Sequence, residues 1–445
     1  MSAMRDELLQ RAHDAVAMAQ AAGADDVVAS AGWGRSLEFA WRDDKVEKVQ
    51  ENTSKAIRVA LYVDGRFSSH GTNDLAPERL RHFIGQAVEL TRALEPDPYR
   101  LITPSELYEG RSDVDLDLVD KDLTADAEGA MTRDERLDWI RRLHDAAHAD
   151  DCVISSTSGM MDSHGISARV SSNGFAGDME RTSVWFGAEC TIQDGEKRPE
   201  AYRWVGGLHR DGLQSPEEVG AECLRRALTR RGQHKVTSRK ATMVVDPEAG
   251  AGLIGRIFGA LSAGSIQQKR SFLAGKLGER IGSEGLTLID DPFIVRGMGS
   301  RWWDGEGIAS KRMPVVENGV LSNYYVDTYY GRKLGWEPTT GGASNIVFAH
   351  GDKDKTGITK DVGDGIYVTS WLGGNANSTT GDYSFGIRGH LIENGALGEP
   401  ISEMNVTGNY LDLLTKLTMV GNDPVPWSAF RCPTLVFEGI DFSGL

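Results

Sequence analysis

Residues 246–259 read DPEAGAGLIGRIFG and follow a β-like run at 241–245. The stretch has the length of a helix, yet no histidine occurs anywhere between His234 and His350. A zinc site needs nitrogen, sulfur or carboxylate ligands that converge on one ion. This segment offers only Asp246 and Glu248, both at its very start. We therefore expect the helix to be present and to carry no metal site.

Length and composition favour a soluble globular protein. A chain of 445 residues is too long for one ordinary core, so two or three domains are expected. The net charge of −16 argues against a nucleic-acid-binding surface, because phosphate contacts need clustered lysine and arginine. The one dense basic stretch, at 225–240, is typical of a solvated helix end. We expect no nucleic-acid partner.

Three features that the sequence lacks indicate the cellular compartment of the protein. The first residues run straight into an amphipathic pattern without the apolar core of a signal peptide. No window approaches the roughly 18 uninterrupted apolar residues of a membrane span. The four cysteines are scattered without a C-x-x-C pair, as suits reduced thiols. We expect a cytoplasmic protein with no membrane contact.

The first 110 residues predict an α+β domain. A stripe of apolar residues with helical spacing covers 4–22, and a second covers 77–94. Asp64-Gly65 between two β-like stretches is a hairpin pattern. Helices packed on an antiparallel sheet follow from this order. The β-like runs lie at 27–30, 37–41, 45–50 and 56–63. A proline-containing, then acidic, stretch at 95–120 is interpreted as a linker.

Residues 111–237 predict a central α+β segment. Thr132 and Glu135 have the spacing of a capping box, and so do Ser215 and Glu218, where a proline also follows the cap. Helices are therefore expected to begin at these two places. The strand-like runs between them are 153–157, 165–172, 182–193 and 201–204.

Residues 238–445 predict a mostly β domain with long glycine-rich loops. The Glu-Asn-Gly sequences at 317–319 and 393–395 are typical of type I′ hairpin turns. One clear later helix is expected at 410–420. The expected strands are 287–289, 311–316, 319–325, 365–370, 386–393 and 433–438. The overall fold class is α+β.

Several loop motifs, taken in order, carry a family resemblance. They are RSFLAGKLG at 270–278, IDDP at 289–292, WDGEG at 303–307, ENGVL at 317–321, SN at 344–345, TGDYSFG at 380–386, IENG at 392–395, GNYL at 408–411 and VGND at 420–423. This set resembles the TldD/PmbA family, once named modulators of DNA gyrase. The resemblance covers essentially the whole chain.

The resemblance implies a role as well as a fold. TldD-type chains carry a zinc helix with a His-Glu-x-x-x-His motif, whereas PmbA (TldE)-type chains lack it. The two are thought to pair into a peptidase whose active site lies in an internal chamber open to unfolded polypeptide. Because 246–259 lacks histidine, this chain resembles the PmbA/TldE arm. The resemblance therefore implies no catalytic residue and no metal ligand here, with zinc in a TldD-type partner subunit.

Two patterns were weighed as metal sites. His144 and His148 are spaced to share a helix face, but Asp145 is one methylene shorter than the glutamate of a His-Glu-x-x-His protease and no third ligand is evident. We interpret both histidines as structural. In TldD-type chains a cysteine near the C-terminus is expected to complete the metal site. Cys432 lies close to that place, and we interpret it as a small buried hydrophobe.

Two other kinds of site are considered from the sequence, a nucleophilic triad and a site for a hard cation. No Gly-x-Ser-x-Gly nucleophile motif occurs, although a triad drawn from Ser384, a histidine at 350 or 390 and an aspartate at 304 or 382 is not excluded by sequence. Acidic residues at 290, 291, 304 and 306 could hold a hard cation, but turn formation explains them more simply.

Candidate binding residues come from the loops of the last domain. The polar stretch 373–381 is expected to be long and flexible, and it would either line a chamber that grips peptide or be an ordinary surface loop. Candidates for peptide binding or for the chamber wall are Ser344, Asn345, Asn375, Asn377, Thr380 and Asp382. Candidates for a protein interface, chosen because aromatic residues dominate binding hot spots, are Trp302, Trp303 and Trp371.

The leading functional hypothesis is a non-catalytic subunit of a heterodimeric zinc peptidase that acts on unfolded peptides. Strand addition is the expected way of holding such a peptide. Two alternatives remain. One is a regulatory factor of the gyrase-modulator type that acts by protein–protein contact, and the other is a homodimer that binds peptides without cleaving them.

Overall fold

The first half of the chain forms one antiparallel sheet of six strands in the order β3-β2-β1-β4-β5-β6. This computed structural model describes residues 2–124 and 129–445. The sheet runs across position 110, so the predicted first and central domains share it. Its strands are β1 (Asp26–Arg42), β2 (Lys45–Val63), β3 (Arg66–Thr72), β4 (Val153–Ser171), β5 (Ala176–Ile192) and β6 (Glu200–Gly207).

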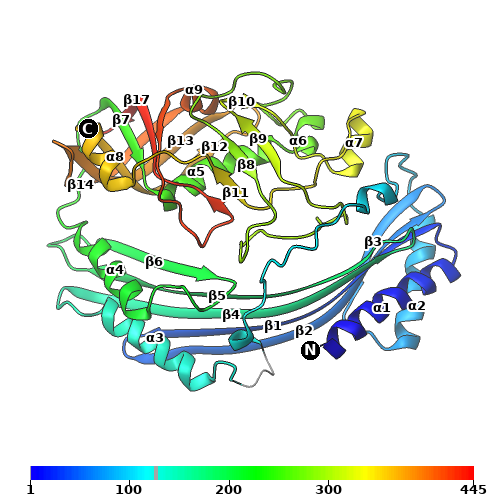
Figure 1. Ribbon diagram of the computed structural model, residues 1–445. Coiled ribbons are helices and arrows are strands. Elements are labelled where there is room, and N and C mark those ends of the chain that lie inside the picture. The colour runs from blue at the N-terminus through cyan, green and yellow to red at the C-terminus, as the bar shows by residue number, and fades with distance from the viewer. Residues whose placement is uncertain (1, 125–128) are drawn as a thin grey trace.

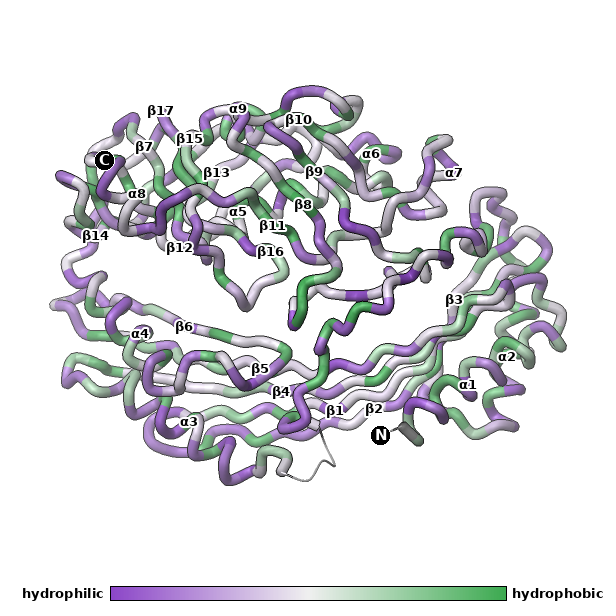
Figure 2. The backbone as a smooth tube through the Cα atoms, viewed as in Figure 1, coloured by the Kyte–Doolittle hydropathy of each residue, from purple (hydrophilic) through white to green (hydrophobic). Residues whose placement is uncertain are grey.

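Four helices cover one face of this sheet (Figure 1). The residues of β1 that pack in the cores under the helices show why the helices share a face. They are Val27, Ala29 and Ala31 under one helix pair and Leu37 and Phe39 under the other, all at odd positions. The opposite face is turned toward the C-terminal half of the chain. Colours for hydrophobic and hydrophilic residues alternate along the strands in Figure 2. The helices are α1 (Ser2–Ala21) and α2 (Pro77–Arg92) at one end, and α3 (Arg133–Ala147) and α4 (Pro216–Leu228) at the other.

Local chemistry sets where these elements begin and turn. Thr132 and Ser215 each form the predicted capping box with the glutamate three residues later. Asp64 and Gly65 both have positive φ, 49° and 73°, and join Val63 to Arg66 in the predicted two-residue hairpin. These predictions are confirmed.

The C-terminal half contains two sheets that share one large core. One has the order β10-β9-β8-β11-β16, and the other has the order β14-β13-β12-β7-β17-β15. Their strands are β7 (Arg239–Val245), β8 (Leu288–Asp290), β9 (Met313–Glu317), β10 (Val320–Leu321), β11 (Ile346–Phe348), β12 (Gly365–Ala376), β13 (Asp382–Glu393), β14 (Ala396–Asn409), β15 (Leu417–Val420), β16 (Phe430–Arg431) and β17 (Leu435–Ser443). The helices are α5 (Pro247–Ala260), α6 (Ala263–Gln267), α7 (Thr328–Leu334), α8 (Lys355–Val362) and α9 (Tyr410–Thr415). The predicted α+β class is confirmed.

Some element boundaries differ from those expected. The helix predicted at 410–420 ends at Thr415, because Leu417–Val420 leaves it to pair with β17. The short helices α6, α7 and α8 were not expected, nor was strand β14. The loop expected at 373–381 is shorter, since β12 continues to Ala376 before β13 begins at Asp382. Tertiary pairing overrides local preference at each of these places.

The expected linker at 95–120 holds little regular structure but packs closely. One short 3-10 helix, η1, covers Ser105–Tyr108, and a second, η2 (Lys121–Leu123), follows it. Leu116 and Leu118 are buried in a small cluster with Leu208. The segment therefore joins the two halves as a packed strap. In the described part of the chain no helix is long and apolar enough to cross a membrane.

Candidate functional site

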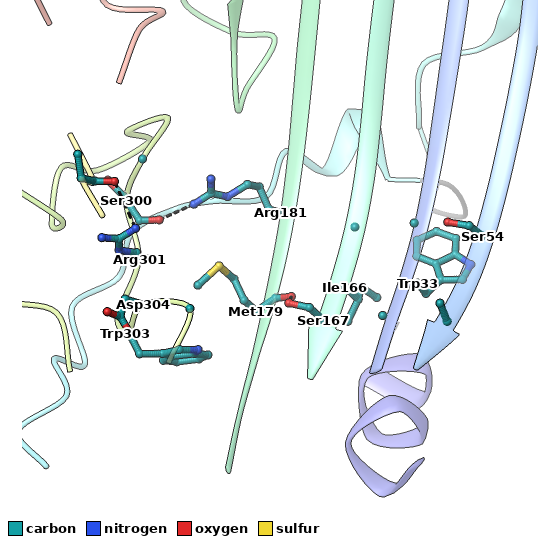
Figure 3. Close-up of a pocket in the computed structure, with 17 residues that line it drawn as sticks. Trp33, Ser54, Ile166, Ser167, Met179, Arg181, Ser300, Arg301, Trp303 and Asp304 are labelled. Atoms are coloured by element: carbon teal, nitrogen blue, oxygen red, sulfur yellow. Dashed lines mark hydrogen bonds between the residues drawn. The ribbon is translucent and has the colours of Figure 1, made fainter. Parts of the chain in front are cut away.

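A cleft of about 770 Å³ lies between the open face of the large sheet and loops of the C-terminal half (Figure 3). Its floor is built from strands β1, β2, β4 and β5, and its far wall from residues 299–305 and Ala343. The floor residues alternate with those that contact the helices, so the same strands serve both faces.

Strand register brings small residues into two rows across the floor. Gly34 pairs with Ser54 on one side and with Gly165 on the other, and Gly165 pairs with Arg181. The next row, named in the order β2, β1, β4 and β5, is Ala56, Gly32, Ser167 and Met179. Four strands at about 4.8 Å spacing make each row about 14 Å wide. On β1, β2 and β4 these positions carry glycine or small side chains, which leaves room above the floor, whereas β5 contributes the longer Met179 and Arg181.

Two arginines form the wall of the cleft (Figure 3). Arg181 donates from Nη1 to the carbonyl of Met298 (2.9 Å) and from Nη2 to the carbonyl of Ser300. Arg301 donates to the carbonyl of Ala343 (3.3 Å). Burial, and after it the Arg301 cation, lower the pKa of Arg181. Among the described residues neither guanidinium has a carboxylate within 4.0 Å.

Asp304 and Trp303 complete the wall. The Asp304 carboxylate is buried and accepts hydrogen bonds from the Thr340 hydroxyl (2.9 Å) and from the N–H of Gly341 (3.0 Å). Trp303 packs edge-on against Phe175, with ring centroids 5.7 Å apart. Because Asp304 already serves as a loop anchor, its oxygens are engaged within the fold.

The cleft is suited to binding and not to nucleophilic attack. Its titratable lining residues are Arg181, Arg301 and Asp304, and no histidine, cysteine or lysine lines it. Of the two histidines considered for a triad with Ser384, His390 lies six positions further along the same strand, about 20 Å away, so these two residues do not act together. The floor instead presents mostly small side chains, among them those of Ser54, Ala56 and Ser167.

The start of α5 does not fit a zinc ion. Asp246 caps the helix by accepting the N–H of Glu248 (3.0 Å), and it also accepts the Tyr367 hydroxyl (2.8 Å). Glu248 is held by Arg226 at 2.8 and 2.9 Å and by Arg203. Burial raises the pKa of Glu248, but the hydrogen bonds from Arg226 outweigh it and leave that pKa below its usual value.

The cysteine considered for the metal site is enclosed in the core. Cys432 is fully buried, and a Cβ added at Gly250 of α5 would lie 2.7 Å from its sulfur. Burial raises the pKa of the Cys432 thiol well above its usual value, so the thiolate that zinc requires is disfavoured. Within residues 2–124 and 129–445 no three His, Cys, Asp or Glu side chains are grouped to hold a metal ion.

The two candidates from the Ser-Asn motif lie inside the protein. Ser344 donates its N–H and hydroxyl to the buried Asp290. Asn345 is completely buried and donates from Nδ2 to the carbonyl of Asp291 (2.8 Å) and to the Ser300 hydroxyl (2.9 Å). These bonds fix the loop behind Arg301. The two residues thus support the cleft wall from behind.

The other four candidates lie together, exposed, at the end of β12, in the turn that follows it and at the start of β13, away from the cleft lining. They are Asn375, Asn377, Thr380 and Asp382. Asn377 Oδ1 accepts the N–H of Thr380 (3.4 Å), and Asp382 accepts the Thr380 hydroxyl (2.7 Å). The hydrogen bond from Thr380, and then that from Asn409, lower the pKa of Asp382. The turn is internally bonded and presents its polar groups to solvent.

The three tryptophans make contacts within the chain. Trp302 donates from Nε1 to the carbonyl of Val114 in the strap (2.8 Å), and Trp371 donates to the carbonyl of Ala249 in α5 (2.9 Å). Trp303 is the one that lines the cleft. Trp302 and Trp303 therefore attach the C-terminal half to the strap and sheet. Their role in contact with a partner protein stays a prediction.

Sequence reasoning missed the floor of the cleft. Glycine reads as a turn residue when neighbours are unknown, so Gly32 and Gly34 fell in the gap between the runs expected at 27–30 and 37–41, whereas Gly165 began the run expected at 165–172. The available indication was the i, i+2 spacing of Gly32 and Gly34 next to β-like runs, which places them on one face of a strand. Arg181 gave no such indication, because its contact to Ser300 spans 119 positions.

The histidine pair lies away from the cleft, at the end of α3. The rings of His144 and His148 are stacked with centroids 5.5 Å apart, and both approach the Ser156 hydroxyl, at 3.2 and 2.9 Å. His144 is only 1% exposed. Burial, followed by His148, lowers the pKa of His144. These contacts support a structural role.

Comparisons with known proteins agree with this architecture. The sequence matches three parts of one family: "PmbA/TldA metallopeptidase domain 1" at 27–91, its central domain at 126–231 and its C-terminal domain at 238–444. The chain is 29% identical over 412 residues to "Metalloprotease PmbA" of Escherichia coli O157:H7, covering 92% of this chain and 90% of that protein.

Solved structures give the same result. A crystal structure of a putative modulator of DNA gyrase from Bacteroides thetaiotaomicron has 39% identity and a TM-score of 0.95, covering 99% of both chains. The crystal structure of TldE from Thermococcus kodakarensis shares the fold, with 18% identity, a TM-score of 0.85 and coverage of 98% of this chain and 100% of that one. Family domains, relatives and fold thus agree, and the chain belongs to the PmbA/TldD metallopeptidase family.

Proposed function

We propose that this chain is the non-catalytic, PmbA/TldE-type subunit of a two-subunit zinc peptidase that acts on unfolded peptides. Zinc would reside in a TldD-type partner subunit. The observation that carries the proposal is the small-residue floor of the cleft, which provides binding surface without catalytic groups. The arginine-bound carboxylates at the start of α5 support it, because they are unsuited to hold a metal here.

An extended peptide is the substrate class that such a floor fits best. Gly34 and Gly165 have no side chains, so a bound backbone can approach the sheet closely. Folded domains are too wide for a floor about 14 Å across. Strands β1 and β4 are paired on both sides, so the peptide would lie on the face of the sheet, and its contact with the small residues there would depend little on its sequence.

The contact with the partner subunit belongs to the same proposal. The exposed turn between β12 and β13 would form part of the chamber wall, and the C-terminal half would supply the interface. The complex would work in the cytoplasm, where the four cysteines, all free thiols in this structure, would stay reduced.

Peptide binding is tested with a fluorescently labelled unstructured peptide and the purified chain. The variant Gly34→Leu should weaken binding at least about tenfold, a loss of about 1.4 kcal/mol. It should fold normally, since an added Cβ meets only Ser54 Oγ at 3.8 Å. The matched control is Gly85→Leu on α2, where a Cβ meets nothing within 4 Å. Equal binding by both variants would remove the cleft from the proposal.

Partnership is tested by native mass spectrometry of the chain with and without a TldD-type subunit. A one-to-one complex that forms at micromolar concentration supports the proposal. A stable homodimer that ignores the added subunit would instead favour a peptide-binding homodimer, and isolation only with gyrase would favour the regulatory alternative.

A further inference from the structure

A second cavity, of about 850 Å³, lies beside the start of α5 and is separate from the cleft. It is enclosed by α4 and β6 of the first half and by α8, the start of α5 and strands β12 to β14 of the second half. The two cavities share no lining residue. Its volume is in the range of small-molecule sites.

Part of the charge in this cavity is internally neutralised. Glu222 is shared by Arg225 (2.6 and 2.8 Å) and Arg226 (2.8 Å). Glu248 is shared by Arg226 and Arg203. Two carboxylates therefore serve three guanidiniums. A third carboxylate, Asp246, also lines the cavity, where it accepts the Tyr367 hydroxyl (2.8 Å) and burial raises its pKa.

Two further cations face the same cavity without a carboxylate. Arg230 is only 9% exposed, and its guanidinium donates to the carbonyl of Glu200. Lys355 stands exposed at the rim. In the described ranges no carboxylate lies within 4.0 Å of either side chain. Burial, and after it the Arg388 cation, lower the pKa of Arg230 to about 10. An isolated buried cation is costly unless an anion accompanies it.

An unused hydroxyl is the second observation that points to a ligand. Ser370 lines the cavity and is 8% exposed, and its Oγ has no hydrogen-bond partner within the part of the chain described. A buried hydroxyl without a partner loses free energy relative to a hydrated one. His390 lies nearby with Nδ1 at 3.4 Å from the Gly398 carbonyl, which leaves Nε2 available. Burial is the main cause that lowers the pKa of His390, and the nearby Arg230 and Arg225 cations lower it further.

We propose that this cavity binds a small molecule that carries an oxyanion, a phosphate or carboxylate group, between Arg230, Ser370 and Lys355. Arginine and lysine recognise such groups through charge-assisted hydrogen bonds, and the Ser370 hydroxyl would donate a further one. The exposed side chains of Tyr202 (50%) and Leu397 (51%) at the rim would contact the rest of the molecule. The site is independent of peptide binding in the cleft.

Inorganic phosphate and acetate are the probes for this site, tested on the full chain by isothermal titration calorimetry at constant ionic strength. Saturable binding of either one is expected. Ser370→Ala should weaken it at least about tenfold, the size expected for one hydrogen bond to a charged group. This variant should keep its fold, because the hydroxyl it removes has no partner. Lys355→Gln, at the exposed rim, should weaken binding as well.

Arg239→Gln is the matched control, since it removes an exposed cation that lies outside the cavity. It should leave anion binding unchanged. Preference for phosphate over acetate, with the same dependence on Ser370, identifies a phosphate ligand, and the reverse preference identifies a carboxylate. Absence of saturable binding by both probes, or equal binding by all variants, would overturn the proposal.

Discussion

Gly34, Ser54 and Gly165 lie side by side on three strands, and none of them has a side chain that fills the space above the sheet. The cleft therefore exists because these three positions carry small residues. This site could not be predicted from the sequence, because strand register is set by pairings more than 100 positions apart, such as Gly34 with Gly165. The motif residues Ser344 and Asn345, predicted as candidates for peptide binding or the chamber wall, are buried, and their hydrogen bonds hold the cleft wall.

One buried ion pair gives a sharp prediction for single residues. Arg136 contacts Asp162 at 2.6 and 3.1 Å, and each residue is only 3% exposed. Asp162→Ala should lower the free energy of unfolding by about 3 kcal/mol, because the arginine is left buried without its partner. Urea denaturation measures this. Asp138→Ala, which breaks exposed pairs on the same helix, should cost no more than about 0.5 kcal/mol.

His144 predicts how stability depends on pH. Its pKa is lowered in the folded protein, mainly by burial, so the unfolded chain binds more protons at mildly acidic pH. Stability should therefore fall as the pH drops below about 6.5, the usual value for histidine. His144→Gln should reduce the loss of stability between pH 7.5 and pH 5.5, measured by urea denaturation at both values. His234→Gln, which removes a 41% exposed side chain, should reduce it less, and the reverse order would contradict this account.

At the scale of elements, the features set by neighbouring residues could be predicted and those set by distant pairing could not. Capping boxes and hairpin turns depend on side chains within four positions, and they occur where expected. In contrast, the runs predicted at 27–30 and 37–41 are one strand of 17 residues. Pairing with β2 and β4 on both sides holds the intervening residues extended.

The cap of α3 is the element-scale prediction. Thr132 Oγ1 accepts the N–H of Glu135 (3.2 Å), and the Glu135 carboxylate accepts the N–H of Thr132 (2.6 Å). Thr132→Ala should therefore lower the free energy of unfolding by about 1 kcal/mol. Thr132→Ser keeps the hydroxyl and should retain most of the stability. If both variants lose the same amount in urea denaturation, the capping bond contributes little.

At the scale of the whole molecule, the two halves face each other (Figure 1) and are joined by hydrogen bonds and ion pairs at several places. Arg181 binds two carbonyls of the 298–300 loop, and Trp302 binds the strap at Val114. The family resemblance predicted this architecture only at the level of the fold class. The facing arrangement itself depends on contacts that no local pattern encodes.

Loss of one such contact should loosen the wall without unfolding the protein. Arg181→Met removes the hydrogen bonds to Met298 and Ser300. Hydrogen exchange should then become faster in residues 298–305 and stay unchanged in the helices under the sheet. Arg58→Met, in exposed β2, is the control and should leave this loop protected. Unchanged exchange in the Arg181 variant would mean that other contacts hold the wall.

The central claim is that this chain binds peptide while a partner subunit supplies the zinc chemistry. The most direct measurement combines metal analysis with cleavage of an unstructured peptide, for the purified chain alone and mixed with a TldD-type subunit. The account predicts no stoichiometric zinc and no cleavage by the chain alone, and chelator-sensitive cleavage by the mixture. Stoichiometric zinc in the chain alone, together with cleavage that a chelator prevents, would contradict it.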